Sequence, residues 1–289
     1  MTLTMSPHPL KFADTMDEYG PSRVVILGVP YDRTTSYRPG TRFGPNAIRE
    51  ASWNFESYLF DHGVDLRDID VFDMGDMEEF GPVDEMYDEV HSTAGSAIRD
   101  RKFLLTFGGE HSISPPIVTN YPSDIGVVVV DAHLDFRNEY LGWKNSHACA
   151  SRRFADHVGI GSIMQIGIRS VGREDLEDAE GLDFIDAYFV SEKGIDASIR
   201  RIEEKLGKKK IYLSIDIDGI DPAYAPGTGT PEPFGLSPFQ VRKLIVKLSS
   251  RLVGADIVEV SPQYDNGNTA ALAARLAREI IATRHPSYR

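Results

Sequence analysis

The sequence predicts one α/β domain built on an eight-stranded, mostly parallel sheet with helices on both faces. Short apolar runs alternate with segments of helical periodicity, which is the pattern of a parallel sheet with crossover helices. The four valines at 127–130 are apolar on both sides, as a strand buried in a parallel sheet is. No repeat or linker divides the 289 residues. We therefore expect a polar N-terminal arm at 1–20 and a single domain at 21–289.

Each expected element follows from a local pattern. Apolar runs predict strands at 24–30, 68–75, 103–109, 127–135, 162–169, 186–192, 210–222 and 254–262. Helical periodicity predicts helices at about 45–57, 83–100, 146–157, 196–207, 237–251 and 268–284. Asp196 and Ser237 are the expected N-caps of their helices, and Gly207 the expected C-terminal stop. The Gly and Pro content of 31–52 predicts a long loop, which in a compact domain is usually functional.

Charge and composition argue against several classes of protein. A formal net charge of −13 disfavours nucleic-acid binding, which normally needs a basic face, and does not favour an anionic membrane surface. No apolar run approaches the roughly 20 residues of a membrane-spanning helix. The single cysteine, Cys149, excludes an intramolecular disulfide and suits a reducing compartment, so a cytoplasmic protein is expected. The first 20 residues carry no signal-peptide pattern.

The clearest chemical signal is the stretch VVVVDAHLD at 127–135. Asp131, His133 and Asp135 alternate after the valines, so in extended backbone their side chains would share one side. The carboxyl ends of strands are where open α/β sheets place their ligands. Caps and salt bridges at a strand exit are the alternative, but unpaired buried charge is expensive. Carboxylate and imidazole groups together are the usual ligands of divalent metals.

Further candidate ligands follow two other strands. Asp216 and Asp218 stand two apart near the end of one, and His111 follows a Gly-Gly pair that would let the backbone approach a ligand closely. Two His and four Asp exceed the ligands of one zinc site, and none is a cysteine. Such a set suits two five- or six-coordinate Mn²⁺ ions. With a bridging hydroxide the centre would be about one unit negative, which favours a cationic substrate.

Five segments together resemble the ureohydrolase (arginase/agmatinase) family: GVPYDRTTSYRPGTRFGPNAIR, GGEHS, DAHLD, SHACASRR and SIDIDGIDPAYAPGTGTPEPFGLS. The resemblance runs from about residue 24 to 284, and every ligand position of the family's motifs is filled. It implies an arginase/deacetylase-like fold, two Mn²⁺ ions and hydrolysis of a guanidino group to urea and an amine. It also implies a homo-oligomer, either a trimer or a hexamer.

The resemblance assigns roles residue by residue. The implied metal ligands are His111, Asp131, His133, Asp135, Asp216 and Asp218. His111 and Asp135 would hold one ion, and His133 and Asp218 would hold the other. Asp131 and Asp216 would bridge the two ions. Asp135 would also accept a hydrogen bond from the bridging hydroxide and pass a proton to the leaving amine. Glu259 matches the position that pairs with the substrate guanidinium, which a carboxylate can bind through two N–H groups. Thr230 matches a residue lining the site, and His147 matches a proton shuttle. The structural alternatives are a partly exposed strand-end charge for Glu259 and a plain turn residue for Thr230.

Residues near the expected site also bear on the substrate. DFRNEY at 135–140 and SHACASRR at 146–153 look like an agmatinase, while the Asn and the SGN pattern typical of an arginase are absent. The expected substrate is therefore a small cation, agmatine, hydrolysed to putrescine and urea. Guanidinobutyrate, guanidinopropionate and arginine stay open as substrates, because only the loops at 31–43 and 137–147 would separate them. Arg137 could receive a carboxylate if it reaches the pocket.

Two other functional classes stay open. A mononuclear zinc amide deacetylase on a related sheet would need fewer carboxylates, and a non-catalytic metal protein would not need a complete ligand set. Several further residues are expected in structural roles. Glu110 and Asp221 would support loops, Arg152 and Arg153 would pair with acidic neighbours, and His62 has no motif around it.

Overall fold

A computed structural model, which describes residues 10–78 and 80–288, has the predicted eight-stranded sheet, and each of its strand pairs is parallel. The spatial order is β4-β1-β5-β10-β9-β6-β7-β8. The strands are β1 (Val24–Val29), β4 (Val71–Asp76), β5 (Phe103–Gly108), β6 (Gly126–Val130), β7 (Ile163–Ile168), β8 (Asp183–Asp186), β9 (Ile211–Asp216) and β10 (Leu252–Val258). A separate antiparallel pair consists of β2 (Tyr58–Leu59) and β3 (Val64–Asp65). The predicted fold class is confirmed.

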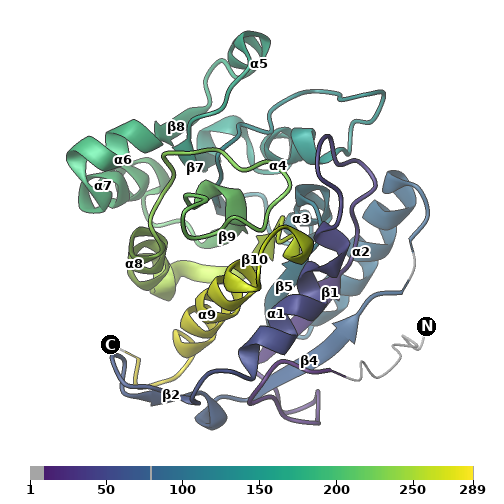
Figure 1. The fold of residues 1–289 in the computed structure, drawn as a ribbon, viewed down its shortest axis with the longest axis vertical. Helices are drawn as coiled ribbons and strands as arrows, with labels where there is room; N and C mark the ends of the chain where they lie inside the picture. Colours follow the sequence, from purple (N-terminus) through teal and green to yellow (C-terminus); the bar gives the residue numbers. More distant parts are fainter. Residues whose placement is uncertain (1–9, 79, 289) are drawn as a thin grey trace.

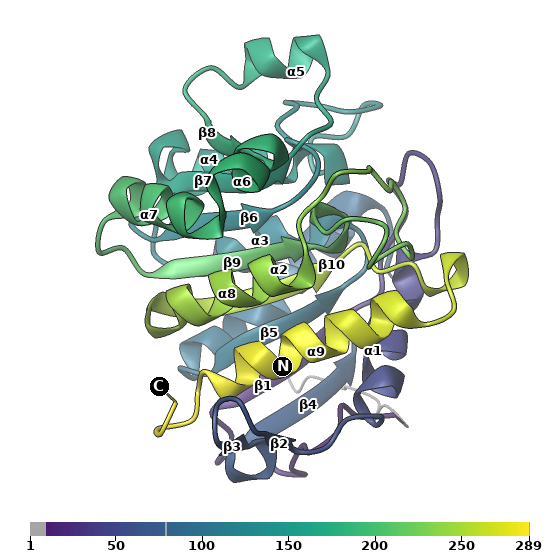
Figure 2. The same cartoon turned by 60° about the vertical axis from the view of Figure 1, so that its left-hand side comes forward.

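Helices cover both faces of the sheet (Figures 1 and 2). One face carries α1 (Gly44–Ser52), α6 (Ala187–Lys193), α7 (Ile195–Leu206), α8 (Pro238–Leu248) and α9 (Asn268–Ala282). The other face carries α2 (Val83–Arg99), α3 (Ser114–Val118) and α4 (Ala150–Val158), and α5 (Arg173–Asp178) projects after β7. Short 3-10 turns are η1 (Thr41–Phe43), η2 (Leu66–Asp68), η3 (His111–Ile113), η4 (His147–Cys149), η5 (Ile160–Ser162), η6 (Ile217–Gly219), η7 (Ser249–Arg251) and η8 (Pro262–Tyr264).

The valine run of β6 shows how the two layers are built. Val128 and Val130 belong to the core between the sheet and α7, α8 and α9, whereas Val127 and Val129 belong to the core under α2 and α4. All four are fully buried, because successive side chains of a strand point to opposite faces and both faces are covered. The alternation anchors the central strands, whose carboxyl ends then form one edge of the sheet.

Several element boundaries differ from the sequence-based expectation. The strand expected at 186–192 is wrong, because β8 ends at Asp186 and the following residues form α6. The Asp186 carboxylate accepts a hydrogen bond from the Phe189 amide at 2.7 Å and caps this helix. Asp196 is not the N-cap of α7, which Gly194 provides at φ 81°. Asp196 lies in the first turn, where negative charge is favoured. Helix α1 ends at Ser52, before the expected residue 57.

The described part of the expected N-terminal arm packs against the sheet. Phe12 is buried in the core, and its amide donates a hydrogen bond to Asp73 Oδ2 at 2.8 Å. Met16 forms a bridge to Phe72 on β4. Residues 1–9 of the arm lie outside the described residues. In the described ranges, no helix has both the length and the apolar character that crossing a membrane requires.

A buried ion pair connects helix α1 to β4, which is the edge strand of the sheet. The guanidinium of Arg49, which is fully buried, donates to Asp73 through Nε at 2.7 Å and Nη2 at 2.9 Å, and its Nη1 contacts Asp76. Asp73 also holds the amide of Phe12, so one carboxylate joins the arm, α1 and β4. Breaking such a pair from one side leaves buried charge uncompensated.

We predict that Arg49→Met lowers the free energy of unfolding by about 3 to 5 kcal/mol, because Asp73 and Asp76 lose their shared guanidinium. Urea denaturation followed by circular dichroism measures the change. Arg67→Met is the matched control, since Arg67 pairs with Asp65 in a similar forked arrangement at the surface, and its midpoint should stay nearly unchanged. Equal shifts in the two variants would contradict this account of the pair.

Candidate active site

The six predicted ligands meet at the carboxyl edge of the four central strands, β5, β10, β9 and β6. His111 opens η3 after β5, Asp216 ends β9, Asp218 lies in η6, and Asp131, His133 and Asp135 follow β6. Extended backbone was expected as far as Asp135, but β6 ends at Val130 and Asp135 has a φ of 47°. The three side chains nevertheless face the same centre.

The ligand atoms form two groups that share one aspartate. His111 Nδ1 lies 3.2 Å from Asp131 Oδ2, 3.2 Å from an oxygen of Asp135 and 3.4 Å from one of Asp216. His133 Nδ1 lies 3.1 Å from Asp218 Oδ2 and 3.6 Å from Asp131 Oδ1. Asp131 therefore presents one oxygen to each histidine. Each group has three candidate ligand atoms within 4.8 Å of one another.

The protonation of His111 fits a ligand that binds through Nδ1. The hydroxyl of Ser214 donates to Asp256 Oδ1 at 2.6 Å, so towards His111 Nε2, 3.0 Å away, it accepts. In the neutral ring, which a bound cation would require, the proton is then on Nε2 and the lone pair is on Nδ1, facing three carboxylates. Among the described residues, His111 Nδ1 and Asp131 Oδ2 are buried without a hydrogen-bond partner. A cation between these atoms would satisfy both, because a histidine ligand is normally oriented in this way from behind.

Crowding of carboxylates shifts the acid–base behaviour of the centre. Burial and the repulsion of Asp218 and Asp131 raise the pKa of Asp216 well above its usual range. Burial would lower the pKa of His111, but the surrounding carboxylates, Asp131 first, raise it well above normal. Without a metal the centre thus gains stability by holding protons, and a divalent cation would replace them.

Glu259 and Thr230 both reach the centre. Glu259 follows β10 with a φ of 63°, an uncommon backbone conformation for a residue with a side chain. It is 6% exposed, and its Oε1 accepts a hydrogen bond from the His111 amide at 2.8 Å, so it is not a partly exposed strand-end charge. The Thr230 hydroxyl donates to Asp218 Oδ2 at 2.9 Å, which gives it a role beyond that of a plain turn residue.

His147 opens η4 beside the centre and is oriented by Thr34. The His147 amide lies 3.0 Å from Thr34 Oγ1, and the ring Nδ1 lies 3.1 Å from the same oxygen. The ring of Tyr140 packs edge-on at a centroid distance of 5.8 Å. Burial lowers the pKa of His147, although the charge of Asp135 acts in the opposite direction. A neutral imidazole next to solvent can take up and return a proton.

A pocket of about 200 Å³ opens onto these residues. Its wall includes Thr35 and Ser36 from the first expected specificity loop and Arg137, Tyr140 and His147 from the second. A third segment, which no sequence pattern predicted to line the site, contributes Ser170, Val171, Gly172 and Asp175. Asp175 accepts hydrogen bonds from Arg137 Nε at 2.7 Å and Nη2 at 3.2 Å, so the arginine that reaches the pocket is already paired.

Residues expected in supporting roles have them in the structure. Glu110 accepts hydrogen bonds from Thr34 and Ser112, and Asp221 accepts from the amides of Ala223 and Gly235. Arg152 and Arg153 both face Asp156, on the same helix. The Gly-Gly turn admits a close backbone approach, but of Tyr31 and not of a ligand, since a Cβ on Gly109 would lie 1.8 Å from the Tyr31 carbonyl oxygen.

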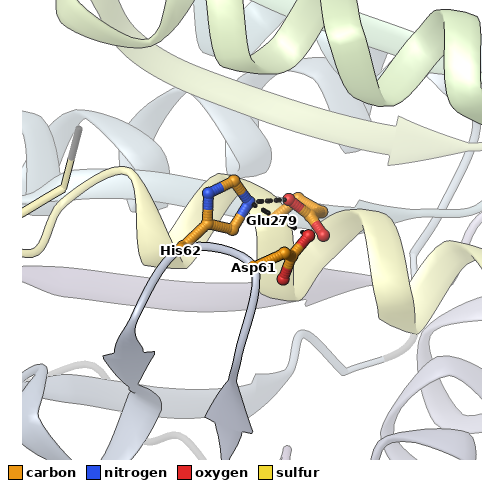
Figure 3. A group of neighbouring side chains, drawn as sticks. All are labelled: Asp61, His62 and Glu279. Carbon is orange, nitrogen blue, oxygen red and sulfur yellow. Dashed lines mark hydrogen bonds and ion pairs between the residues drawn. The ribbon is translucent and has the colours of Figure 1, made fainter.

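A third group of potential ligands lies between the β2–β3 turn and α9 (Figure 3). His62 Nε2 lies 2.7 Å from Glu279 Oε2 and 3.8 Å from Asp61 Oδ2. Two guanidinium groups already neutralise these carboxylates: Arg242 contacts Asp61 and Glu279, and Arg275 contacts Glu279 at 2.6 Å. The charges of this cluster are thus balanced by side chains, and the cluster connects the β2–β3 turn to α9. A structural role of this kind is expected for a histidine without a motif.

Comparisons with known proteins show which family this chain resembles. The model of the arginase family matches residues 22–283. The chain is 36% identical to an agmatinase of Halalkalibacterium halodurans over 93% of this chain and 95% of that protein. It is 37% identical to a guanidinobutyrase of Pseudomonas aeruginosa, over 89% and 84%.

A solved structure extends the likeness to three dimensions. The structure of an agmatine ureohydrolase of Thermoplasma volcanium superposes with a TM-score of 0.91 at 47% identity, covering 95% of this chain and 94% of that one. The chain therefore belongs to the arginase family and is an enzyme of the amidinohydrolase class.

Proposed function

We propose that this enzyme hydrolyses agmatine to putrescine and urea at a centre of two Mn²⁺ ions. The observation that carries the proposal is the position of Asp131, whose two oxygens face two separate histidine-containing groups. The names of the similar agmatinases support the substrate. We also propose that residues 21–289 act as one domain of a cytoplasmic trimer or hexamer, as the family resemblance implies.

In this proposal the ligands divide between the ions as their neighbours suggest. His111 and Asp135 would hold one ion, and His133 and Asp218 the other. Asp131 would bridge them, and so would Asp216, whose Oδ2 faces His111 and whose Oδ1 accepts from the Asp218 amide at 2.9 Å. The carboxylates, which are four of the six ligands, suit manganese. When bound, a pair of divalent ions supplies hydroxide at neutral pH.

The surrounding side chains would orient the substrate and move protons. Glu259 would accept guanidinium N–H groups and hold the guanidinium carbon beside the centre, because a carboxylate and a planar guanidinium match geometrically. Asp135, whose backbone conformation is as uncommon as that of Glu259, would take up and pass on the proton of the attacking water. His147 would exchange that proton with solvent through the pocket.

The pairing of Arg137 favours a substrate without a carboxylate. Its guanidinium is held by Asp175 and lies over the ring of Tyr140 at 5.0 Å. A substrate carboxylate would have to compete with Asp175, whereas the terminal ammonium of agmatine meets an acidic pocket. Guanidinobutyrate is the second candidate, because Arg137 does line the pocket and one similar protein is named guanidinobutyrase.

We predict that the Mn²⁺-saturated protein carries about two ions per chain, as measured by elemental analysis after gel filtration. Asp131→Ala should lose nearly all bound metal, because this residue is proposed to touch both ions, whereas Asp218→Ala should retain about half. Similar residual metal in the two variants would contradict the bridging role. A single tightly bound zinc, with no activation by Mn²⁺, would reject the binuclear centre.

We predict that kcat/KM for agmatine exceeds that for arginine at least about a hundredfold, a difference of roughly 2.7 kcal/mol. Arginine brings an α-carboxylate and an α-ammonium that need hydrogen bonds on leaving water, and Arg137 is already engaged. Urea release from agmatine, arginine and guanidinobutyrate, assayed side by side, measures the preference. Faster hydrolysis of either carboxylate-bearing compound would overturn agmatine as the substrate and leave the metal centre standing.

We predict that Asp175→Asn shifts the preference towards guanidinobutyrate, raising its kcat/KM relative to that of agmatine at least about tenfold. The substitution removes the carboxylate that neutralises Arg137, which can then receive a substrate carboxylate. The matched control is Asp178→Asn, an exposed acidic residue of the same helix. If both variants keep the original ratio, the Arg137–Asp175 pair does not set specificity.

A further inference from the structure

We propose that Thr34 and Glu110 are positioning residues that place the proton of neutral His147 on Nδ1, which leaves Nε2 as the nitrogen that exchanges protons with the pocket. The inference rests on the proposed function, because it concerns His147 as the proton shuttle. The three residues come from distant parts of the chain: the loop after β1, the end of the turn after β5, and the start of η4.

Glu110 acts in this arrangement as an acceptor of hydrogen bonds. Its carboxylate is fully buried, and its Oε2 accepts from the Thr34 amide at 2.8 Å. Its Oε1 accepts from the hydroxyl of Thr34 at 2.5 Å and from that of Ser112 at 2.6 Å. Burial raises the pKa of Glu110, while the hydrogen bonds from Ser112 and Thr34 favour its ionised form. A hydroxyl has one proton, and the short contact to the ionised carboxylate assigns the proton of Thr34 to Glu110.

The lone pairs that remain on the Thr34 hydroxyl oxygen then determine which ring nitrogen of His147 carries the proton. The backbone amide of His147 is an obligatory donor and occupies one lone pair of Thr34 Oγ1 at 3.0 Å. The second lone pair faces His147 Nδ1 at 3.1 Å. Thr34 then has no proton left for this contact, so the contact is a hydrogen bond only when Nδ1 carries the ring proton. Ser146 Oγ, 3.3 Å from Nδ1, is a second and longer contact that can accept from the same N–H.

This tautomer has a direct consequence for proton exchange. Within the described residues, the hydrogen bonds of the His147 ring all involve Nδ1, and the residue lines the pocket. Nε2 therefore carries the lone pair, takes up a proton from the centre and returns it to solvent, while Nδ1–H stays in place. The opposite tautomer would present an N–H at Nε2 and could not accept that proton, and a misplaced ring proton is known to slow acid–base catalysis strongly.

Four single variants and one double variant test the proposal. Thr34→Val keeps the shape of the side chain and removes the hydroxyl, and it should lower kcat at least about tenfold with KM changed by less than about twofold. Thr34→Ser restores the hydroxyl and should recover most of kcat. In a His147→Ala background, Thr34→Val should have no further effect, because Thr34 acts through His147. Thr119→Val removes a hydroxyl that contacts His91 Nδ1 at 3.0 Å outside the pocket lining, and it should stay within about twofold of the wild type. An equal loss in both backgrounds would overturn the proposal.

A readout independent of activity uses ¹⁵N NMR of the full-length chain with labelled histidines and Mg²⁺ as a diamagnetic cation. The His147 signals are identified by their loss in His147→Gln. Wild-type Nδ1 should appear as the protonated nitrogen and Nε2 as the unprotonated one. Thr34→Val should give a mixture. Glu110→Gln, whose amide can donate to Thr34 and reverse the chain of hydrogen bonds, should favour the opposite tautomer, with metal content measured in parallel.

The outcomes separate this inference from the proposed function. A wild-type ring protonated at Nε2, or a tautomer unchanged in both Thr34→Val and Glu110→Gln, would overturn the positioning role. A wild-type enzyme that releases no urea from any guanidino compound would instead overturn the proposed function, and the NMR result would still decide the tautomer. A variant of Thr34 that fails to fold leaves Glu110→Gln to decide the question.

Discussion

Like charge confined to a small buried volume is the constraint on which the rest of the structure depends. Four aspartates converge at the carboxyl ends of β6 and β9, and burial, reinforced by repulsion among them, raises the pKa of Asp216 and Asp135. Two histidines compensate only in part: burial would raise the pKa of Asp218, but the charge of His133 holds it below its usual range. A centre of this kind would gain stability from divalent cations, which is the physical reason for proposing a metal site at this edge.

The same arrangement of hydrogen bonds orients both imidazoles that are proposed to act at the centre. A hydroxyl stands between a buried carboxylate and a ring nitrogen: Ser214 between Asp256 and His111, and Thr34 between Glu110 and His147. Because the hydroxyl gives its single proton to the carboxylate, it accepts from the ring and fixes the tautomer. On neutral His111 the lone pair of Nδ1 then faces the carboxylates. On His147 the lone pair of Nε2 faces the pocket.

The sequence predicts much of this arrangement because its signals are local. Alternation of apolar runs is sufficient for the parallel sheet, and DAHLD places three candidate ligands after a buried strand whether or not the strand continues. The segment after Asp186 has a strand-like sequence, because Tyr188, Phe189 and Val190 are common in strands. It forms a helix instead, which the Asp186 carboxylate stabilises by capping its first turn. Contacts such as Thr34–Glu110 join residues 76 positions apart, and no local pattern encodes them. The family resemblance supplied the roles of Glu259 and His147, which spacing alone leaves open.

The most direct test of the account is the location of manganese in the protein. Crystals grown with Mn²⁺ and measured at the manganese absorption edge would show each ion as an anomalous scattering peak. The account predicts two peaks, one beside His111 and one beside His133, with Asp131 between them. A single peak, or a peak at Asp61, His62 and Glu279 in place of these two, would contradict the proposed binuclear centre.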